Sequence, residues 1–189
     1  MRTPKLKLLF LCCHNHCGSI LAEAICRHLA GDMIEARSAG KKPSGTIHPL
    51  ALRHLAAAGI STRHLYSKSW DENELADFTP DAVISICGQA IDELYPRWLG
   101  STRKIDWSLP DPGTDTSNLK RAEKNFHHAI ATLELRLDIF ARCLRRGVLY
   151  CDSLLLLDQF ATTYPEACPL CVTLTPPRVL YAEPLAWQG

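Results

Sequence analysis

The sequence predicts an α/β domain built on a mostly parallel β-sheet. Short apolar runs, which are typical of buried strands, alternate along the chain with segments whose apolar residues recur at helical spacing. This alternation favours helices that pack on a parallel sheet. With 189 residues, the chain is long enough for one domain with a substantial hydrophobic core.

The first unit consists of a strand, a tight turn and a helix. The run Leu-Lys-Leu-Leu-Phe-Leu over 6–11 has the pattern of a buried strand, and residues 12–19, Cys-Cys-His-Asn-His-Cys-Gly-Ser, form the turn. Apolar residues then recur at helical spacing as far as Leu29. We expect Ser19 to cap this helix and Gly31 to end it.

Further strands and helices follow in alternation. The sequence predicts a strand over 33–37, a loop over 38–45, a helix over 49–58, a strand over 82–87, a short helix over 90–94, a short strand over 104–107 and a loop over 109–113. A long amphipathic helix over 119–146 and a second helix over 152–163 complete the series. We therefore expect one domain over 1–164 and an irregular tail over 165–189, which holds five prolines.

Charge and hydropathy exclude two classes of partner. Lysine and arginine number 21 against 20 aspartate and glutamate residues, so a broad electrostatic attraction to nucleic acid is not expected. The longest apolar run, residues 8–13, is far shorter than the ~20 residues of a membrane-spanning helix. We expect a cytoplasmic protein that binds neither nucleic acid nor a membrane.

Cysteine is unusually frequent. The chain has nine cysteines, an odd number, and no apolar stretch typical of a secretory signal, which argues against a disulfide framework. Thiol chemistry, metal binding and simple burial remain as explanations. The cysteines are at positions 12, 13, 17, 26, 87, 143, 151, 168 and 171.

The turn after the first strand is the candidate site. Ligands of open parallel sheets bind beyond the carboxyl ends of the strands, and a turn followed by a helix N-terminus offers backbone N–H groups to an anion. Cys12 is the first residue of this turn, where the same positive potential is expected to lower its pKa. The alternative is that Cys12 and Cys13 only pack at the end of the strand.

The order of several motifs resembles that of the low-molecular-weight protein tyrosine phosphatases and of the thiol-dependent arsenate reductases that share their fold. This family opens with a strand, then Cys-x5-Arg-Ser, then a helix. Because Gly113, rather than an aromatic residue, follows the Asp-Pro pair 111–112, the chain is more similar to the arsenate reductase branch. The similar residues, within roughly 5–160, are 9–12, 15, 17, 19, 22–24, 37–40, 43–45, 48–51, 67–72, 83–87 and 107–112.

The resemblance implies a fold and a set of roles. The fold is three-layered, with a central, mostly parallel four-stranded sheet and helices on both faces. Cys12 is then the nucleophile that attacks arsenic or phosphorus, and Asp111 is the general acid that protonates the leaving oxygen. By itself, Asp111 is more typical of a turn residue than of an acid, and the neighbouring Cys12 loop favours the acid. Ser19 would hydrogen-bond the thiolate, and Asn15 would hold the loop in shape with a left-handed backbone.

The turn differs from the family pattern because it lacks the arginine. Cys13, His14, Asn15, His16 and Gly18 form the anion-binding loop, and Gly18 stands where the family has its arginine. An arginine binds two oxygens of an oxyanion at once. Loss of one preorganised donor typically costs about 2.7–4 kcal/mol, roughly 10²–10³ in rate. We therefore expect weakened activity, with backbone N–H groups still able to bind an anion.

The thiol that completes a reduction is only partly identified by the resemblance. Reductases with an internal disulfide relay have two further cysteines near the end of the central strand, and Cys87 matches the first of them. At 94–95, where the second would fall, the chain has no cysteine. Cys17, or an external donor such as glutathione or thioredoxin, is expected to act instead.

Metal binding is a separate possibility in two places. The turn packs five soft or borderline ligands into residues 12–17, a set that zinc or copper accepts. A turn whose amides point inward directs many side chains outward, so not all five converge on one ion. Cys168 and Cys171 form one CxxC pair in the tail, which is weak evidence for zinc. We predict no resident metal or cofactor.

Three functions remain open. The first is arsenate reduction by Cys12 and Asp111, with thiol-dependent release of arsenite. The second is hydrolysis of phosphomonoesters, including phosphotyrosine, by the same two residues. The third is a non-catalytic protein that binds an anion, arsenite or a metal through Cys12, Cys13 and Cys17.

Overall fold

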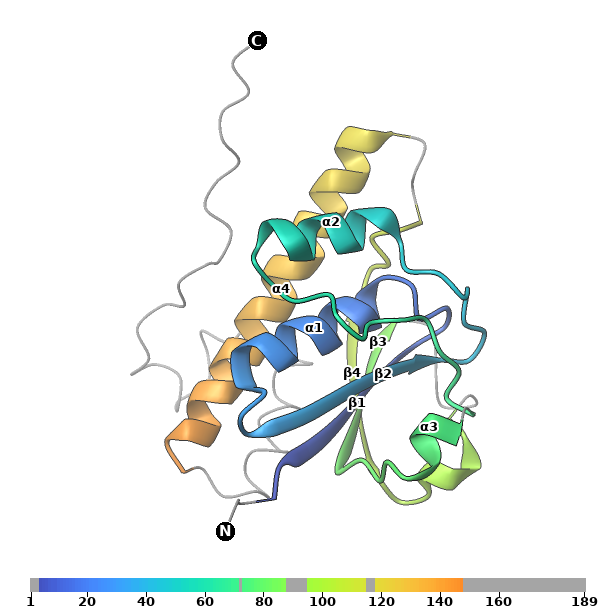
Figure 1. Cartoon of the computed structure of the whole chain (residues 1–189), viewed down its shortest axis with the longest axis vertical. Helices are drawn as coiled ribbons and strands as arrows, with labels where there is room; N and C mark the ends of the chain where they lie inside the picture. The colour runs from blue at the N-terminus through green and yellow to red at the C-terminus, as the bar shows by residue number, and fades with distance from the viewer. Residues whose placement is uncertain (1–3, 72, 88–94, 115–117, 148–189) are drawn as a thin grey trace.

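A parallel sheet of four strands forms the centre of the protein (Figure 1). The computed structural model describes residues 4–71, 73–87, 95–114 and 118–147. The predicted α/β class with a parallel four-stranded sheet is confirmed. The strands are β1 (Leu6–Cys12), β2 (Ile34–Gly40), β3 (Ala82–Cys87) and β4 (Arg103–Leu109), arranged β2-β1-β3-β4.

Helices cover both faces of this sheet. On one face lie α1 (Gly18–Ala30), α2 (Pro49–Ala57) and the long α4 (Leu119–Arg145), and α1 and α2 both pack against α4. On the other face lie the short helix α3 (Asn73–Ala76) and a 3-10 turn, η1 (Arg97–Leu99). Figure 1 shows α1 and α4 on the side of the sheet opposite α3. The result is a three-layer arrangement.

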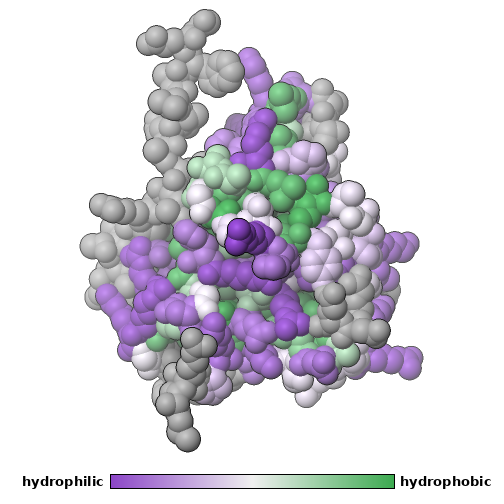
Figure 2. Space-filling view, viewed as in Figure 1, coloured by the Kyte–Doolittle hydropathy of each residue, from purple (hydrophilic) through white to green (hydrophobic). Residues whose placement is uncertain are grey.

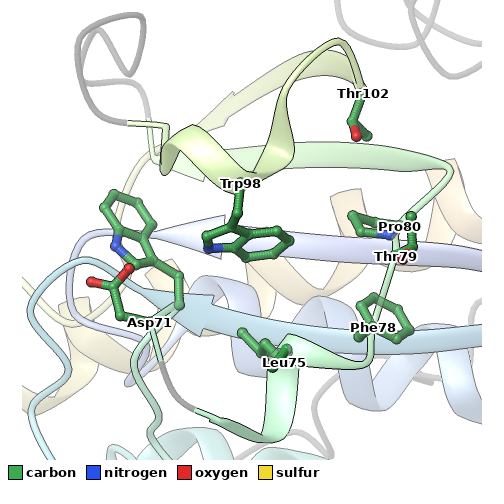
Figure 3. A pocket seen from close by; sticks show the side chains of 9 residues that line it. Asp71, Leu75, Phe78, Thr79, Pro80, Trp98 and Thr102 are labelled. Carbon is green, nitrogen blue, oxygen red and sulfur yellow. The ribbon is translucent and has the colours of Figure 1, made fainter.

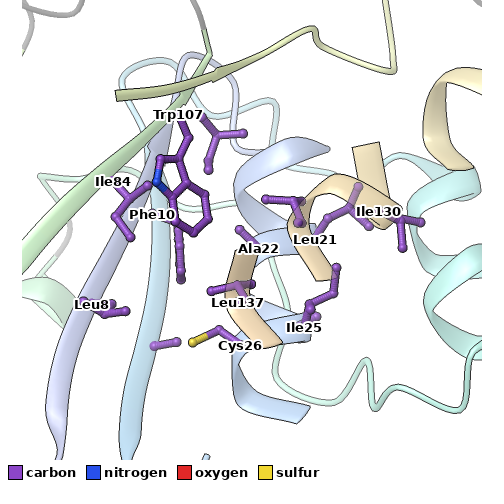
Figure 4. Close-up of a cluster of buried hydrophobic side chains, with 14 of the residues drawn as sticks. Leu8, Phe10, Leu21, Ala22, Ile25, Cys26, Ile84, Trp107, Ile130 and Leu137 are labelled. Atoms are coloured by element: carbon purple, nitrogen blue, oxygen red, sulfur yellow. The ribbon is translucent and has the colours of Figure 1, made fainter. Parts of the chain in front are cut away.

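The larger hydrophobic core fills the space between the sheet and the long helices (Figure 4). Phe10 of β1 and Trp107 of β4 lie with ring centroids 6.2 Å apart, and both are buried. Leu21 of α1 and Leu137 of α4 pack against them. Because both faces of the sheet are covered, the two central strands β1 and β3 are apolar almost throughout, which is why they were predictable.

Several boundaries and segments differ from the predictions. β2 continues to Gly40, since Gly40 pairs with Cys12 of β1, so residues 38–40 are not part of a loop. The N-cap of α1 is Cys17, without a side-chain cap, so Ser19 does not cap the helix. α3 and η1 were not predicted. The helices predicted over 90–94 and 152–163 and the tail over 165–189 lie outside the described residues.

The surface is mainly hydrophilic on the face seen in Figure 2, with hydrophobic side chains gathered over α2. Within the described ranges, no helix has both the length and the apolar character needed to cross a membrane.

Candidate active site

The carboxyl edge of the sheet brings the predicted site residues together. Cys12 ends β1, Cys87 ends β3, and Asp111 follows β4 by two residues. Because parallel strands end at the same edge, these three residues meet there. They line a cleft of about 570 Å³. The other residues that line it are Cys13, His14, His16, Gly18, Ile86, Ser108, Leu109, Pro110, Pro112 and Thr114.

Two groups hold the Cys12 sulfur. Its Sγ lies 2.8 Å from Ser19 Oγ and accepts a hydrogen bond of 3.1 Å from the backbone N–H of Asn15. Burial raises the pKa of Cys12, while the contacts with Ser19 and Asn15 act in the opposite direction. The predicted lowering of this pKa is therefore wrong. Burial prevails because no lysine or arginine is among the described residues that line the cleft.

Asn15 holds the turn in place. It is fully buried and has φ 45°, the left-handed conformation expected for it. Its side-chain N–H₂ donates to Ser19 Oγ at 2.8 Å and to Ser38 Oγ at 2.9 Å, and its Oδ1 accepts from the backbone N–H of Lys68 at 2.8 Å. Asn15 thus joins the turn to β2 and to the segment that follows α2.

A buried charged network lies behind Asn15. Glu23 of α1 is fully buried and accepts a hydrogen bond of 2.5 Å from Ser38 Oγ. The ammonium of Lys68 lies 3.4 Å from Glu23, and the guanidinium of Arg27 lies 2.5 Å from it. Sequence reasoning assigned these residues no role. The available signal was a glutamate between two alanines on the apolar side of the first helix.

Gly18 lies against a side chain of the neighbouring strand. A Cβ atom on Gly18 would lie 2.7 Å from Cγ2 of Ile86, closer than non-bonded carbon atoms come. Any side chain at position 18, including an arginine, therefore requires Ile86 to move. This contact is absent from the sequence pattern because the two residues belong to α1 and β3.

Asp111 lies in a turn and also faces the cleft. Its Oδ1 accepts a hydrogen bond of 2.9 Å from the backbone N–H of Gly113. Asp111 therefore both stabilises the turn and lines the cleft. Asp111 also hydrogen-bonds the buried Cys17 thiol, and burial together with this carboxylate raises the pKa of Cys17. Cys17 is thereby kept protonated, and it is buried and does not line the cleft, whereas Cys12 and Cys87 do.

Cys87 has a thiol neighbour that sequence reasoning did not identify. Its Sγ lies 3.6 Å from Cys13 Sγ, well beyond the 2.03–2.05 Å of a disulfide, so the two are reduced thiols in contact. Burial, and then the neighbouring Cys13 thiol, raise the pKa of Cys87 to about 12. Both cysteines line the same cleft as Cys12.

A second hollow lies on the opposite face of the sheet (Figure 3). It has a volume of about 400 Å³, and Trp98 of η1 lies across it from Leu75 of α3 and Phe78. Asp71 is the one ionisable group among the described residues that line it. Of these two hollows, only the first has cysteine and histidine side chains among its described lining residues.

Comparison with known proteins places this fold and cleft in a family. Residues 7–149 match the sequence profile of the family described as "Low molecular weight phosphotyrosine protein phosphatase". The chain belongs to this family. Its predicted resemblance to the family is thereby confirmed.

Members similar in sequence are arsenate reductases by name. The "Glutaredoxin arsenate reductase" of Synechocystis sp. is 32% identical over 106 residues, which cover 56% of this chain and 78% of that protein. "Arsenate reductase 2" of Staphylococcus epidermidis is 29% identical over 133 residues, 70% of this chain and 98% of that protein. The predicted similarity to the arsenate reductase branch is confirmed.

Solved structures agree with this placement. The thioredoxin-dependent arsenate reductase of Corynebacterium glutamicum has a TM-score of 0.58 and 26% identity. That match covers 78% of this chain and 65% of the other, so the present chain spans just under two thirds of that protein. A structure titled "An arsenate reductase in the phosphate binding state" has a TM-score of 0.55 and 27% identity and covers 70% of this chain and 96% of the other.

Proposed function

We propose that the protein reduces arsenate to arsenite, with Cys12 as the nucleophile and Asp111 as the general acid. One observation carries this assignment: Cys12 Sγ, held by Ser19 and by the N–H of Asn15, opens onto the cleft that Asp111 also lines. Similar proteins named as arsenate reductases, one of them in a phosphate-binding state, support an oxyanion as the ligand.

The first step forms a bond between sulfur and arsenic. The Cys12 thiolate attacks arsenic(V), and one As–O bond breaks. The leaving oxygen takes the proton of Asp111 and departs as water. The backbone N–H groups at the start of α1 bind the remaining oxygens.

The second step transfers two electrons to arsenic. Cys87 loses its proton to water as its sulfur attacks Cys12 Sγ; the S–As bond breaks, and its electron pair stays on arsenic, which leaves as arsenite. Two thiols are oxidised to one disulfide as arsenic(V) becomes arsenic(III). A small thiol such as glutathione, or a thiol-transfer protein of the thioredoxin or glutaredoxin type, then reduces the disulfide. The names of the relatives point to such donors.

Glycine at position 18 makes this reaction slow. The described lining of the cleft contains no lysine or arginine, so no fixed cation there opposes the charge of the oxyanion. The proposed site therefore depends on backbone N–H groups for anion binding, which we expect to lower the rate by about 10²–10³.

Turnover assays with matched cysteine variants test the proposal. Arsenite formation from arsenate with glutathione is expected for the wild type and for Cys26→Ala, whose cysteine is buried in the core away from the cleft, and is expected to vanish in Cys12→Ser. Thiol-independent hydrolysis of an aryl phosphate that needs Cys12 would identify a phosphatase instead. Absence of both activities would identify a non-catalytic binding protein.

A further inference from the structure

The pairing of two strands places the thiols of Cys13 and Cys87 side by side. β1 and β3 pair in parallel with Leu11 opposite Ser85, and Cys13 and Cys87 each come two residues further along the chain. Their Sγ atoms lie 3.6 Å apart. The register of the sheet therefore brings these two sulfurs into contact at its carboxyl edge.

Both sulfurs of this pair can be reached by a small ligand. Cys13 and Cys87 are half-buried and line the cleft of about 570 Å³. Cys12 lines the same cleft, but its Sγ lies against Ser19 Oγ and the backbone N–H of Asn15. Of the two thiols in the pair, the proposed reduction uses only Cys87, so it gives Cys13 no chemical step.

One soft atom can bridge two sulfurs at this spacing. Bonds of about 2.3 Å, the length of a Zn–S bond, at angles near tetrahedral put two sulfurs of one central atom roughly 3.5–3.8 Å apart. The 3.6 Å between Cys13 Sγ and Cys87 Sγ falls within this range. The pair is therefore already spaced for an atom bound between its sulfurs.

The charge of the cleft decides which soft atom fits best. Zinc and copper bind thiolates, so both thiol protons would have to leave before the ion binds. Burial, and then the Cys13 thiol, raise the pKa of Cys87 to about 12, and the described lining of the cleft contains no lysine or arginine. Trivalent arsenic needs no thiolate charge, because each of its hydroxyl groups leaves as water together with one thiol proton.

We propose that Cys13 and Cys87 form a dithiol binding site for trivalent arsenic. Arsenous acid, As(OH)₃, is uncharged at neutral pH. Two As–S bonds form, two As–O bonds and two S–H bonds break, and two molecules of water leave. The third hydroxyl stays on arsenic, and the oxidation states of arsenic and of both sulfurs are unchanged. The net charge is also unchanged, which suits two half-buried sulfurs.

Arsenic bound at this site inhibits the proposed reduction. Cys87 cannot both hold arsenic and attack Cys12, so arsenite withdraws the second thiol from the reduced protein. The product of the reaction is therefore also its inhibitor. This consequence rests on the proposed function, whereas the binding of trivalent arsenic does not.

Phenylarsine oxide is the probe for the site, because its arsenic bonds to two sulfurs only. Native mass spectrometry counts the phenylarsenic groups on each chain while glutathione is added as a competing thiol. Two thiols in one site resist this competitor, since the second As–S bond forms at a high effective concentration. Cys168 and Cys171 are another closely spaced pair in the sequence, so every protein tested is the full chain with Cys168→Ser/Cys171→Ser, called the parent.

Serine variants of the parent identify the two sulfurs. We expect Cys13→Ser and Cys87→Ser to lose the arsenical at a glutathione concentration at least about tenfold lower than the parent does. Cys12→Ser and Cys26→Ala, whose cysteine is buried in the core, are the controls and should retain it as the parent does. Circular dichroism shows that each variant is folded. Retention in folded Cys13→Ser or Cys87→Ser, or an equal loss in Cys12→Ser, would overturn the site.

Inhibition of arsenate consumption by added sodium arsenite provides the second readout. We expect Cys13→Ser to need at least about tenfold more arsenite than the parent for the same fractional loss of its own arsenite-free rate. Equal sensitivity of the two proteins would overturn the inhibition. Capture of the arsenical that depends on Cys13 and Cys87, without arsenate turnover, would leave the site standing and refute the proposed function. Turnover with equal capture by every variant would refute the site and leave the proposed function standing.

Discussion

Gly18 and Ile86 fill adjoining space beside Cys12: a Cβ atom on Gly18 would lie 2.7 Å from Ile86 Cγ2. Where the family has an arginine, this chain therefore has a glycine that packs against a bulky, buried side chain of β3. An arginine placed at position 18 therefore also needs space that the Ile86 side chain now fills.

Gly18→Arg alone is expected to give little gain in arsenite formation, because its Cβ collides with Ile86. The double variant Gly18→Arg/Ile86→Ala is expected to gain at least about tenfold, since a guanidinium binds two oxygens of the oxyanion. Ile86→Ala alone serves as the control and should show no gain. Loss of the buried side chain costs about 2–5 kcal/mol, so circular dichroism must show that each variant is folded. An inactive but folded double variant would contradict the account.

The raised pKa of Cys12 predicts a thiol that reacts slowly at neutral pH. Burial disfavours the thiolate, so alkylation of Cys12 by iodoacetamide should increase with pH and reach its midpoint above the ~8.5 of an ordinary cysteine. Peptide mass spectrometry separates Cys12 from the other cysteines. In Gly18→Arg/Ile86→Ala the midpoint should fall, because a nearby cation favours the thiolate. A wild-type midpoint below neutral pH would contradict the burial argument.

The buried Glu23 network is expected to contribute strongly to stability. Glu23→Ala leaves Lys68 without its buried carboxylate, and breaking such a pair costs about 3–5 kcal/mol. Glu35→Ala removes a carboxylate that pairs with Arg37 at 3.0 Å near the surface, where the cost is about 0–1 kcal/mol. Urea denaturation of both variants measures the difference. Similar costs for the two would show that the network is unimportant.

Because Glu134 of α4 is buried, we expect the folded protein to be less stable at high pH. Burial, and then the neighbouring Asp138, raise the pKa of Glu134 to about 7, and both of its carboxylate oxygens are buried without a hydrogen-bond partner. Between pH 4.5 and 7 the folded state binds this proton more tightly than the unfolded state does. The free energy of unfolding therefore falls as pH rises through this window, by up to about 3 kcal/mol.

Glu134→Gln should remove this pH dependence and raise the free energy of unfolding at pH 8. Asp32→Asn, which changes an exposed carboxylate near Arg145, is the control and should keep the wild-type slope. Urea denaturation at pH 5 and at pH 8 measures the free energy of unfolding of each variant, and the difference between the two pH values gives its pH dependence. If the free energy of unfolding of Glu134→Gln depended on pH as that of the wild type does, Glu134 would not be the cause of the pH dependence.

The regular elements were predictable because each carries its own pattern. β1 and β3 are apolar runs buried on both faces, and α4 keeps one apolar face over its whole length. α3 has four residues and η1 three, too few to show a period, and the end of β2 is polar or small. These segments owe their structure to tertiary contacts rather than to local preference.

The site was predictable only in part, for a related reason. Cys12, Asn15 and Asp111 follow or precede elements with clear patterns, so the parallel sheet fixes their place at one edge. The contacts of Gly18 with Ile86, of Cys13 with Cys87 and of Gly113 with Cys17 join residues far apart in the chain. No spacing in the sequence reports such contacts. The pKa of Cys12 likewise depends on burial that only the packed turn reveals.

The most direct test of the central claim locates the oxidised cysteine after one turnover. Reduced protein is mixed with arsenate without added thiol, quenched with acid, and mapped by peptide mass spectrometry while arsenite is measured. The account predicts a disulfide between Cys12 and Cys87 in an amount equal to the arsenite formed. Arsenite formed while Cys12 remains a free thiol, or arsenate left unreduced by the fully folded protein, would contradict it.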